Sequence, residues 1–167
     1  FLQLMGGKAE MNDIYTSLFN HSLTGDTDCG GLLSYNYISG EPVADIENGR
    51  PLFVRSASST FNLANFMRSH LYSSVGVLKI GNDILFHDEH IKVDRITAHG
   101  GLFKTKGVGQ RILAAALQSP IYVMDTAGEG GAWGIALLAA SMERDDRMPL
   151  ASFLEEKVFA GNKGEVI

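Results

Sequence analysis

The chain is poor in the features that mark secreted, disulfide-bonded or membrane-spanning proteins. It has a single cysteine, Cys29, so no internal disulfide can form, and this fits a reducing compartment. No apolar run is long enough to cross a membrane, and no secretory signal peptide is visible. We therefore expect a cytoplasmic protein.

Positive charge is also scarce. The 14 Lys and Arg residues are outnumbered by 19 Asp and Glu residues, which gives a net charge of −5, and they are scattered along the chain. A nucleic-acid-binding surface needs a basic patch or stripe, and none is present. We expect neither a nucleic acid nor a membrane as a partner.

What is present suits one folded domain. The chain has 167 residues, of which 45% are hydrophobic and 20% are charged, so it can bury a core of ordinary size. It begins with Phe1 inside an apolar run rather than with a methionine. We expect a piece of a longer protein.

The stretch from Ile96 to Ala140 carries the clearest pattern. Its order is strand, Gly-Gly, helix, strand, glycine-rich turn, helix, which predicts an α/β fold. Backbone N–H groups are free at two helix starts in this order, and such groups attract anions. The segments are an inner strand at Val93–Ala98, the pair Gly100-Gly101, a helix with Val108, Ile112, Leu113, Ala116 and Leu117 on one face, the strand Ile121–Met124, and Gly128–Gly131.

The other expected elements follow from the same patterns. The longest helix is expected from Phe61 to Ile80, with Ser59 or Thr60 as its N-cap. The remaining elements are a strand at Phe1–Met5 that runs into Gly6-Gly7, a helix from about Glu10 to His21, a brief strand at Leu52–Val54 and a last amphipathic helix at Leu150–Phe159.

Several motifs together resemble the C-terminal part of the FGGY carbohydrate kinases, which are sugar kinases of the actin-like ATPase superfamily. The resemblance rests on four segments and covers most of the chain. They are Gly100-Gly101-Leu102 before a helix, Ser119-Pro120-Ile121-Tyr122-Val123, Glu129 with Ala132-Trp133-Gly134-Ile135-Ala136, and Ser39-Gly40-Glu41-Pro42.

The chain departs from the family pattern at a few positions. Leu102 stands where a small residue is usual, Trp133 replaces a Leu, and Ile135 replaces an Ala. An Arg that usually lies near Glu41 is absent, and so is the Glu expected in the segment from Leu63 to Leu71.

The resemblance implies a fold and an activity. The fold would be the actin-like ATPase (ribonuclease H-like) domain, a mixed sheet of about five strands with helices on both faces. The intact enzyme would transfer the γ-phosphate of ATP, as a Mg²⁺ complex, to a sugar hydroxyl, and pentuloses such as xylulose or L-ribulose are the closest match. Residues 1–167 would form the C-terminal nucleotide-binding domain. The sugar would bind through an N-terminal domain that this chain lacks, and a homodimer stays open.

The resemblance also implies binding residues but no catalytic one. Backbone at Gly100, Gly101 and Leu102 would line the adenine pocket, and Thr105 would touch the base. Gly6 and Glu10 would face the ribose and phosphates, although a glutamate near phosphate is electrostatically unfavourable. The general-base Asp and the phosphate-binding Thr segment cannot be placed in this sequence, so we expect the fragment alone to be inactive.

Each candidate site has a simpler interpretation. Gly100-Gly101 could be an ordinary strand-to-helix turn, and Glu10 an acidic residue in a first helical turn. The turn Gly128–Gly131 lacks the Lys-Ser/Thr of a Walker A motif, so a structural role is favoured. The segment His87–His90 has two imidazoles and two carboxylates, but a surface turn is favoured over a metal site. Cys29 has no recognisable His partner, which favours a small buried residue.

A second function, from a different class, stays open. Actin-like ATPase domains also occur in sensors and regulators that bind a nucleotide without phosphorylating a sugar. Leu102 and the missing family Arg and Glu would fit relaxed catalysis. A helix-turn-helix upstream of Phe1 would favour such a regulator, whereas a Gly-Thr-Ser segment would favour a kinase.

Overall fold

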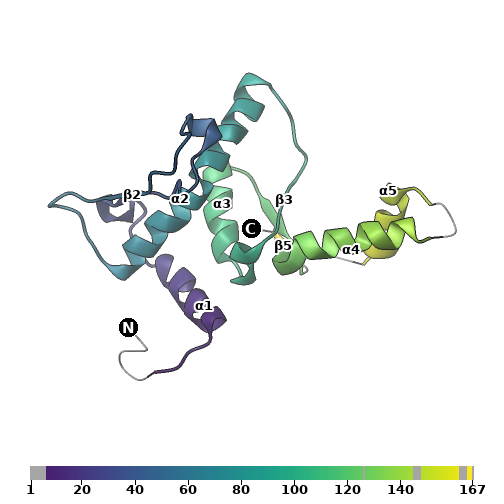
Figure 1. The fold of residues 1–167 in the computed structure, drawn as a ribbon, viewed down its shortest axis with the longest axis horizontal. Coiled ribbons are helices and arrows are strands. Elements are labelled where there is room, and N and C mark those ends of the chain that lie inside the picture. The colour runs from purple at the N-terminus through teal and green to yellow at the C-terminus, as the bar shows by residue number, and fades with distance from the viewer. Residues whose placement is uncertain (1–6, 126, 145–147, 162–164, 167) are drawn as a thin grey trace. The chain divides into compact units, whose positions relative to one another are not determined.

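The computed structural model describes residues 7–125, 127–144, 148–161 and 165–166. The chain divides into two compact units (Figure 1). Unit 1 contains residues 1–92 and 115–118, and unit 2 contains residues 93–114 and 119–167.

Unit 1 is built on two helices and a two-stranded ribbon. The helices are α1 (Met11–Ser22) and α2 (Leu63–Asp83), and the ribbon pairs β1 (Leu33–Tyr35) with β2 (Leu52–Val54) in antiparallel register. Short 3₁₀ turns occupy Cys29–Gly31 and Pro42–Ala44, and a π-helical turn at Ile84–Asp88 continues α2. The two expected helices and the expected strand at Leu52–Val54 are confirmed.

Arg68 connects the two helices of unit 1. Its Nη1 donates to the carbonyl oxygens of Leu23 and Gly25, at 3.4 and 3.0 Å, just beyond the end of α1. Its Nε donates to the hydroxyl of Tyr72, one turn further along α2, at 2.9 Å. The carbonyl groups near a helix C-terminus lack intrahelical donors, so a guanidinium placed there satisfies them and holds α1 against α2.

The start of α2 differs from the expectation. The N-cap is Asn62, whose side chain accepts a hydrogen bond from the amide of Asn65 at 2.8 Å. Ser59 and Thr60 were expected there, but their groups are engaged elsewhere. The Ser59 hydroxyl donates to the carbonyl of Gly31, and the Thr60 amide donates to the carbonyl of Gly30. The helix therefore begins two residues later than the sequence pattern suggests.

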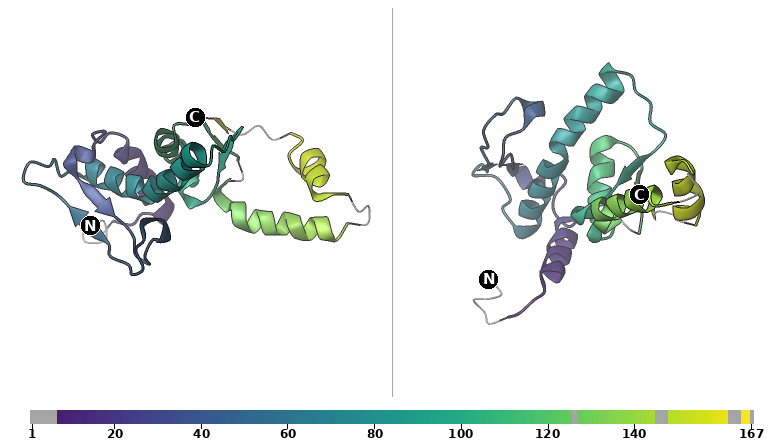
Figure 2. Two further views of the ribbon diagram at one scale, coloured as in Figure 1. Left: turned by 90° about the horizontal axis from the view of Figure 1, so that it is seen from above. Right: turned by 45° about the vertical axis from the view of Figure 1, so that its right-hand side comes forward.

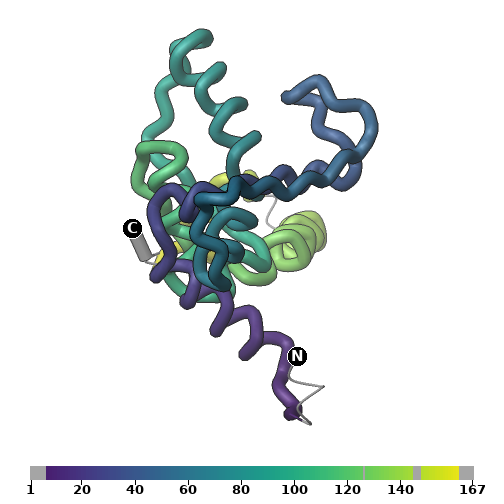
Figure 3. The backbone as a smooth tube through the Cα atoms, turned by 90° about the vertical axis from the view of Figure 1, so that its left-hand side faces the viewer, coloured from purple at the N-terminus to yellow at the C-terminus, as the bar shows by residue number. Residues whose placement is uncertain are grey.

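An aromatic cluster attaches the ribbon to α2. Phe53 of β2 meets Phe66 edge-on at a ring-centroid distance of 5.4 Å and stacks on His70 at 5.9 Å. Polar contacts complete the junction, because the Ser34 hydroxyl lies 3.1 Å from Nδ1 of His70. The loop from residue 36 to residue 51, drawn in blue in Figure 3, connects the two strands of this ribbon.

Unit 2 contains a three-stranded mixed sheet in the order β3-β4-β5. Strand β3 (Ile96–Ala98) runs parallel to β4 (Ile121–Val123), and β5 (Glu165–Val166) pairs antiparallel with β4. The helix α3 (Val108–Leu117) lies between β3 and β4 in the chain. Its predicted apolar face is confirmed, because Val108 is fully buried and Ile112 and Leu113 are each 5% exposed.

Two expectations about the sheet are wrong for the described residues. The strand expected at Val93–Ala98 is shorter, and β3 lies at an edge of the sheet rather than inside it. The polar residues Asp94 and Arg95 precede β3 and are not part of it, and the Arg95 guanidinium lies over the ring of Tyr122. The described strands also form two separate sheets rather than one of about five strands. The strand expected at Phe1–Met5 falls outside the described residues.

The helices after β4 are α4 (Gly130–Met142) and α5 (Leu150–Phe153), which continues into a π-helical turn at Leu154–Val158. Figure 2 shows α4 as one uninterrupted helix in light green. None of its residues is buried, and its apolar side chains Ile135 and Met142 are 69% and 85% exposed. In the described part of the chain, no helix combines the length and apolar character that a membrane span requires.

Candidate functional site

The carboxyl ends of β3 and β4 place two short turns side by side. Because the strands are parallel, the segments that follow them emerge at the same edge of the sheet, where ligands of α/β proteins commonly bind. A 3₁₀ turn at Gly101–Lys104 follows β3, and another at Ala127–Glu129 follows β4. The Gly100 amide donates to the carbonyl oxygen of Ala127 at 2.7 Å and joins the two turns.

Gly100 and Gly101 both leave bare backbone. Gly100 has φ 117° and ψ 176°, a conformation that an L side chain rarely adopts, so the turn itself requires glycine there. Gly101 has no positive φ. A Cβ atom at either position would meet no described atom within 4 Å. Packing therefore gives no reason for glycine at position 101.

Gly128 of the second turn and Gly130, which begins α4, are different, because side chains in and just before the first turn cover them. A Cβ atom on Gly128 would lie 3.1 Å from side-chain carbons of Lys104, and one on Gly130 would lie 2.7 Å from Nδ1 of His99. Glycine at these two positions lets Lys104 and His99 lie directly on the backbone. The structural role expected for Gly128 and Gly130 agrees with this packing.

An ion pair joins the same two turns. The Nζ of Lys104 lies 2.5 Å from Oε1 of Glu129, which is 25 residues away in the sequence. The hydrogen bond from Lys104 and its positive charge lower the pKa of the Glu129 carboxyl. Both side chains are more than half exposed, so the pair orients the two turns but adds little stability.

Leu102 departs from the family pattern, and α3 accommodates its side chain. A Cβ atom on Gly109 of α3 would lie 2.9 Å from Cγ of Leu102 and 3.2 Å from the ring of Phe103. The Leu102 side chain therefore packs against Gly109, and the larger residue in the turn is matched by the smallest residue in the helix.

The remaining expected site residues lie in three different settings. Thr105 ends the first turn and is 5% exposed, so a ligand could reach only a small part of its side chain. Glu10 belongs to unit 1, where it is the exposed N-cap residue of α1 and makes no side-chain cap. Gly6 lies outside the described residues. The structure therefore brings together Gly100, Gly101, Leu102 and Thr105.

Three neighbours of this turn were not expected as site residues. They are His99, which precedes the first turn and covers Gly130, and Lys104 and Glu129, which belong to the two turns and pair with each other. A lysine close behind a Gly-Gly pair and a glutamate within a glycine-rich turn were visible in the sequence. Their proximity follows from the parallel pairing of β3 with β4, which spacing along the chain does not reveal.

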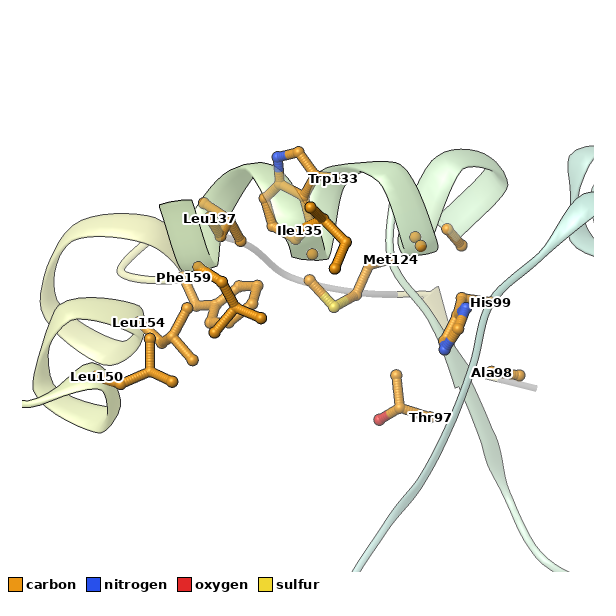
Figure 4. A pocket seen from close by; sticks show the side chains of 15 residues that line it. Thr97, Ala98, His99, Met124, Trp133, Ile135, Leu137, Leu150, Leu154 and Phe159 are labelled. Carbon is orange, nitrogen blue, oxygen red and sulfur yellow. The ribbon is translucent and has the colours of Figure 1, made fainter. Parts of the chain in front are cut away.

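An apolar pocket of about 490 Å³ lies beside the turn, between the end of β3, α4 and residues 150–159, which we call the α5 segment (Figure 4). Trp133 and Ile135 come from α4, Leu154 and Phe159 come from the α5 segment, and His99 follows β3. Gly100 and Gly101 do not line this pocket. No Lys or Arg is among its described lining residues, which does not suit a phosphate-bearing group.

The other candidates from the sequence lie in unit 1. His87 lies within the π-helical turn, His90 follows it, and both are exposed. Among the described residues no group of three or more His, Cys, Asp or Glu side chains is placed to hold a metal ion. Cys29 is 3% exposed, and burial raises the pKa of its thiol. A buried thiol with a raised pKa forms little thiolate, so it is a poor nucleophile.

Comparison with known proteins gives the family. Residues 1–143 match the FGGY family of carbohydrate kinases, C-terminal domain. A search of curated protein sequences finds no match.

Solved structures give the same fold. The chain is similar to the xylulose kinase from Rhodospirillum rubrum, with a TM-score of 0.65, 21% sequence identity, and coverage of 94% of this chain and 30% of that one. It is also similar to the gluconate kinase from Lactobacillus acidophilus, with a TM-score of 0.59, 20% sequence identity, and coverage of 89% of this chain and 29% of that one. A third similar structure is the Plasmodium falciparum glycerol kinase with ADP, with a TM-score of 0.57, 18% sequence identity, and coverage of 84% of this chain and 27% of that one.

The chain thus spans about 30% of the length of the xylulose kinase. Its fold is the mixed α/β, actin-like ATPase fold expected from the sequence. The chain belongs to the FGGY family of carbohydrate kinases, and it corresponds to the C-terminal domain of that family.

Proposed function

We propose that this chain supplies the ATP-binding part of an ATP-dependent carbohydrate kinase, and that the adenine base lies against Gly100 and Gly101. The supporting observation is Gly101. It has neither a positive φ nor any atom within 4 Å of a Cβ position, so neither conformation nor packing explains why it is glycine. Close approach of a ligand to the backbone explains it, because only glycine presents backbone without a Cβ atom.

A purine suits this surface better than it suits the neighbouring apolar pocket. The base is flat and carries several hydrogen-bonding atoms, and it can lie on the bare backbone of Gly100 and Gly101, with only the small accessible part of the Thr105 side chain within its reach. The apolar pocket offers few polar groups to a base, and its described lining offers no cation to the phosphates. We therefore place the nucleotide at the Gly100 turn and leave the pocket to apolar contacts.

The Lys104–Glu129 pair would hold this surface in shape. It joins the turn after β3 to the turn after β4, and the Gly100–Ala127 hydrogen bond joins them a second time. Two links across the edge of the sheet limit the freedom of the backbone before a ligand arrives. A surface ordered in advance costs less entropy on binding.

The Mg²⁺ of the ATP complex is not assigned to residues of this chain. In the described residues no cluster of carboxylates, cysteines or histidines is placed to hold it. Mg²⁺ commonly keeps several waters and binds the nucleotide phosphates through few protein ligands.

For the intact enzyme we propose phosphoryl transfer from ATP to a sugar hydroxyl. Such transfer depends mainly on positioning and on stabilising negative charge, which requires groups from both sides of a closed site. The similar structures are described as kinases of xylulose, gluconate and glycerol. Within that range we propose a pentulose, xylulose or L-ribulose, because the sequence most resembles the pentulose kinases.

A pair of matched variants tests where the nucleotide binds. Gly101→Val adds a branched side chain on the proposed adenine surface, and Gly131→Val adds the same side chain beside the apolar pocket. Both positions have open space around the Cβ site. In a titration of the chain with ADP followed by NMR, Gly101→Val should weaken binding by at least about tenfold, whereas Gly131→Val should leave it unchanged.

The opposite pattern, with loss only in Gly131→Val, would move the nucleotide to the apolar pocket. Equal binding by both variants would show that Gly101 is not at the site. Circular dichroism spectra that match those of the unmodified chain exclude unfolding as the cause.

A further inference from the structure

Unit 1 contains a second concave site, far in sequence from the Gly100 turn. A cavity of about 370 Å³ lies between the β1 region and one face of α2. Three tyrosines line it, Tyr35, Tyr37 and Tyr72, and the rings of Tyr35 and Tyr37 are 5.8 Å apart between centroids. This volume lies within the range of small-molecule sites in proteins.

Gly76 lines the cavity with backbone atoms alone. It lies inside α2, where glycine weakens a helix, and a Cβ atom at this position would meet no described atom within 4 Å. Neither conformation nor packing therefore requires glycine at position 76. The missing side chain leaves open the space beside Tyr72 and Ser73.

The polar groups of the lining have unused hydrogen-bonding capacity. The Ser73 hydroxyl accepts from the Asn36 amide at 3.1 Å, and the Tyr72 hydroxyl accepts from Arg68 at 2.9 Å. The hydrogen of each hydroxyl has no acceptor among the described residues, so each can donate to a ligand. Asp28 accepts from the Gly30 amide through Oδ1, and Oδ2 has no donor among the described residues.

The charge of the lining selects against anions. Asp28 lines the cavity, whereas no Lys, Arg or His is found among the described lining residues. The nearest cation, Arg68, is not part of the lining, and it donates to the Tyr72 hydroxyl and to the carbonyl oxygens of Leu23 and Gly25. A phosphate or carboxylate would therefore meet the like charge of Asp28 with no cation in the lining to bind it. A sugar hydroxyl both donates and accepts, so it suits neighbouring hydroxyl and carboxylate groups. The C–H groups of a sugar ring also lie favourably on the electron-rich face of an aromatic ring.

We propose that this tyrosine cavity binds a neutral monosaccharide or polyol. The tyrosine rings would contact the C–H face of the ligand. Tyr72 and Ser73 would donate hydrogen bonds to its hydroxyl groups, and Asp28 would accept one. The site does not depend on the proposed nucleotide site, because it shares no residue with the Gly100 turn.

The test measures binding of D-glucose, D-xylose and xylitol to the 167-residue chain, by saturation-transfer NMR and by amide shifts on titration. At least one of these neutral probes should show saturation transfer and should shift the amides of Tyr72, Ser73 and Gly76. D-gluconate, which carries a carboxylate, should bind at least about tenfold more weakly than D-glucose.

Two matched variants separate the cavity from the rest of α2. Gly76→Leu would fill the cavity and Gly81→Leu would not, although both positions lie in α2 and both have open space at the Cβ site. Leucine favours a helix more than glycine does, so both variants should fold. Gly76→Leu should weaken binding of the neutral probe at least about tenfold, and Gly81→Leu should not change it.

Three results would overturn the proposal. The first is the absence of saturation transfer for every neutral probe, which would leave Tyr35 and Tyr37 as a surface for contact with protein. The second is equal binding to the Gly76→Leu variant. The third is preferred binding of gluconate. Failure of ADP to bind at Gly101 would affect none of these results, so the two proposals can fail separately.

Discussion

At the scale of single residues, Gly100 and Gly101 separate a conformational role from a binding role. Gly100 has a φ of 117°, so Gly100→Ala should lower the free energy of unfolding by about 1 kcal/mol or more. Gly101 has open space and no positive φ, so Gly101→Ala should change it by less than about 0.5 kcal/mol. Urea denaturation of the two variants measures both values.

The alternative assignment predicts a different result. If Gly101 were needed for the turn, the two alanine variants would lose similar stability. A valine at position 101 adds no backbone strain of this kind, because Gly101 has no positive φ, so Gly101→Val acts only by steric exclusion of the ligand.

His70 gives unit 1 a dependence on pH. Burial lowers the pKa of its imidazole below the ordinary value of 6.5, because the charged form is disfavoured between Phe53 and Phe66. The unfolded chain then binds more protons than the folded chain, so stability is fully present above pH 6.5 and falls as the pH drops through the folded pKa.

His70→Gln removes this titration. The difference in unfolding free energy between the unmodified chain and the variant should therefore shrink as the pH falls from 7.5 to 5, as measured by urea denaturation at constant salt. A difference that stays constant across this range would show that His70 does not titrate differently in the folded chain.

At the scale of elements, the start of α2 depends on one side chain. Asn62→Ala removes the hydrogen bond to the amide of Asn65 and should destabilise the chain by about 1 kcal/mol. Asn62→Asp keeps an acceptor at the N-cap and should retain most of the stability. Thermal unfolding of the two variants checks this, and equal loss in both would place the cap elsewhere.

The elements also show what the sequence could and could not predict. The apolar face of α3 was predictable because Val108, Ile112 and Leu113 recur at helical spacing. The start of α2 was not, because Ser59 and Thr60 are good caps in isolation but are held by the Gly30–Gly31 turn. Such long-range contacts decide between several capable residues, and local propensity does not contain them.

The candidate site divides in the same way. Its glycines were visible as a motif, and the packing of Gly130 under His99 was not. The ion pair of Lys104 with Glu129 joins residues 25 apart and exists because two parallel strands end together. Leu102 departs from the family motif, and only the structure shows that its side chain packs against Gly109.

At the scale of the whole molecule, the exposed apolar residues of α4 should make the isolated chain self-associate. Ile135 and Met142 are 69% and 85% exposed. Large exposed apolar patches are typical of protein–protein interfaces. In the proposed enzyme the remaining part of a longer chain would cover this helix. Charged substitutions, Ile135→Glu with Met142→Lys, should reduce self-association seen by light scattering without lowering the thermal midpoint.

A control substitution makes this prediction specific to α4. Ile38 of unit 1 is 76% exposed, and Ile38→Glu adds outside α4 the same negative charge that Ile135→Glu adds within it. It should leave self-association unchanged. A monodisperse monomer at high concentration in the unmodified chain would contradict the prediction.

The last prediction separates nucleotide binding from catalysis. The proposed adenine surface lies within this chain, whereas the general base, the phosphate-binding segment and the sugar site are expected in other parts of a longer protein. ADP should therefore bind the 167-residue chain weakly and shift the amide signals of Gly100, Gly101, Leu102 and Thr105. Phosphoryl transfer from ATP to D-xylulose or L-ribulose should be undetectable, because an open site with one wall neither aligns the reactants nor excludes water. A coupled assay for ADP release measures this, and robust sugar phosphorylation by the chain alone would overturn the assignment of roles. Nucleotide binding by the intact protein with no transfer to any sugar would instead favour an actin-like regulatory module over a kinase.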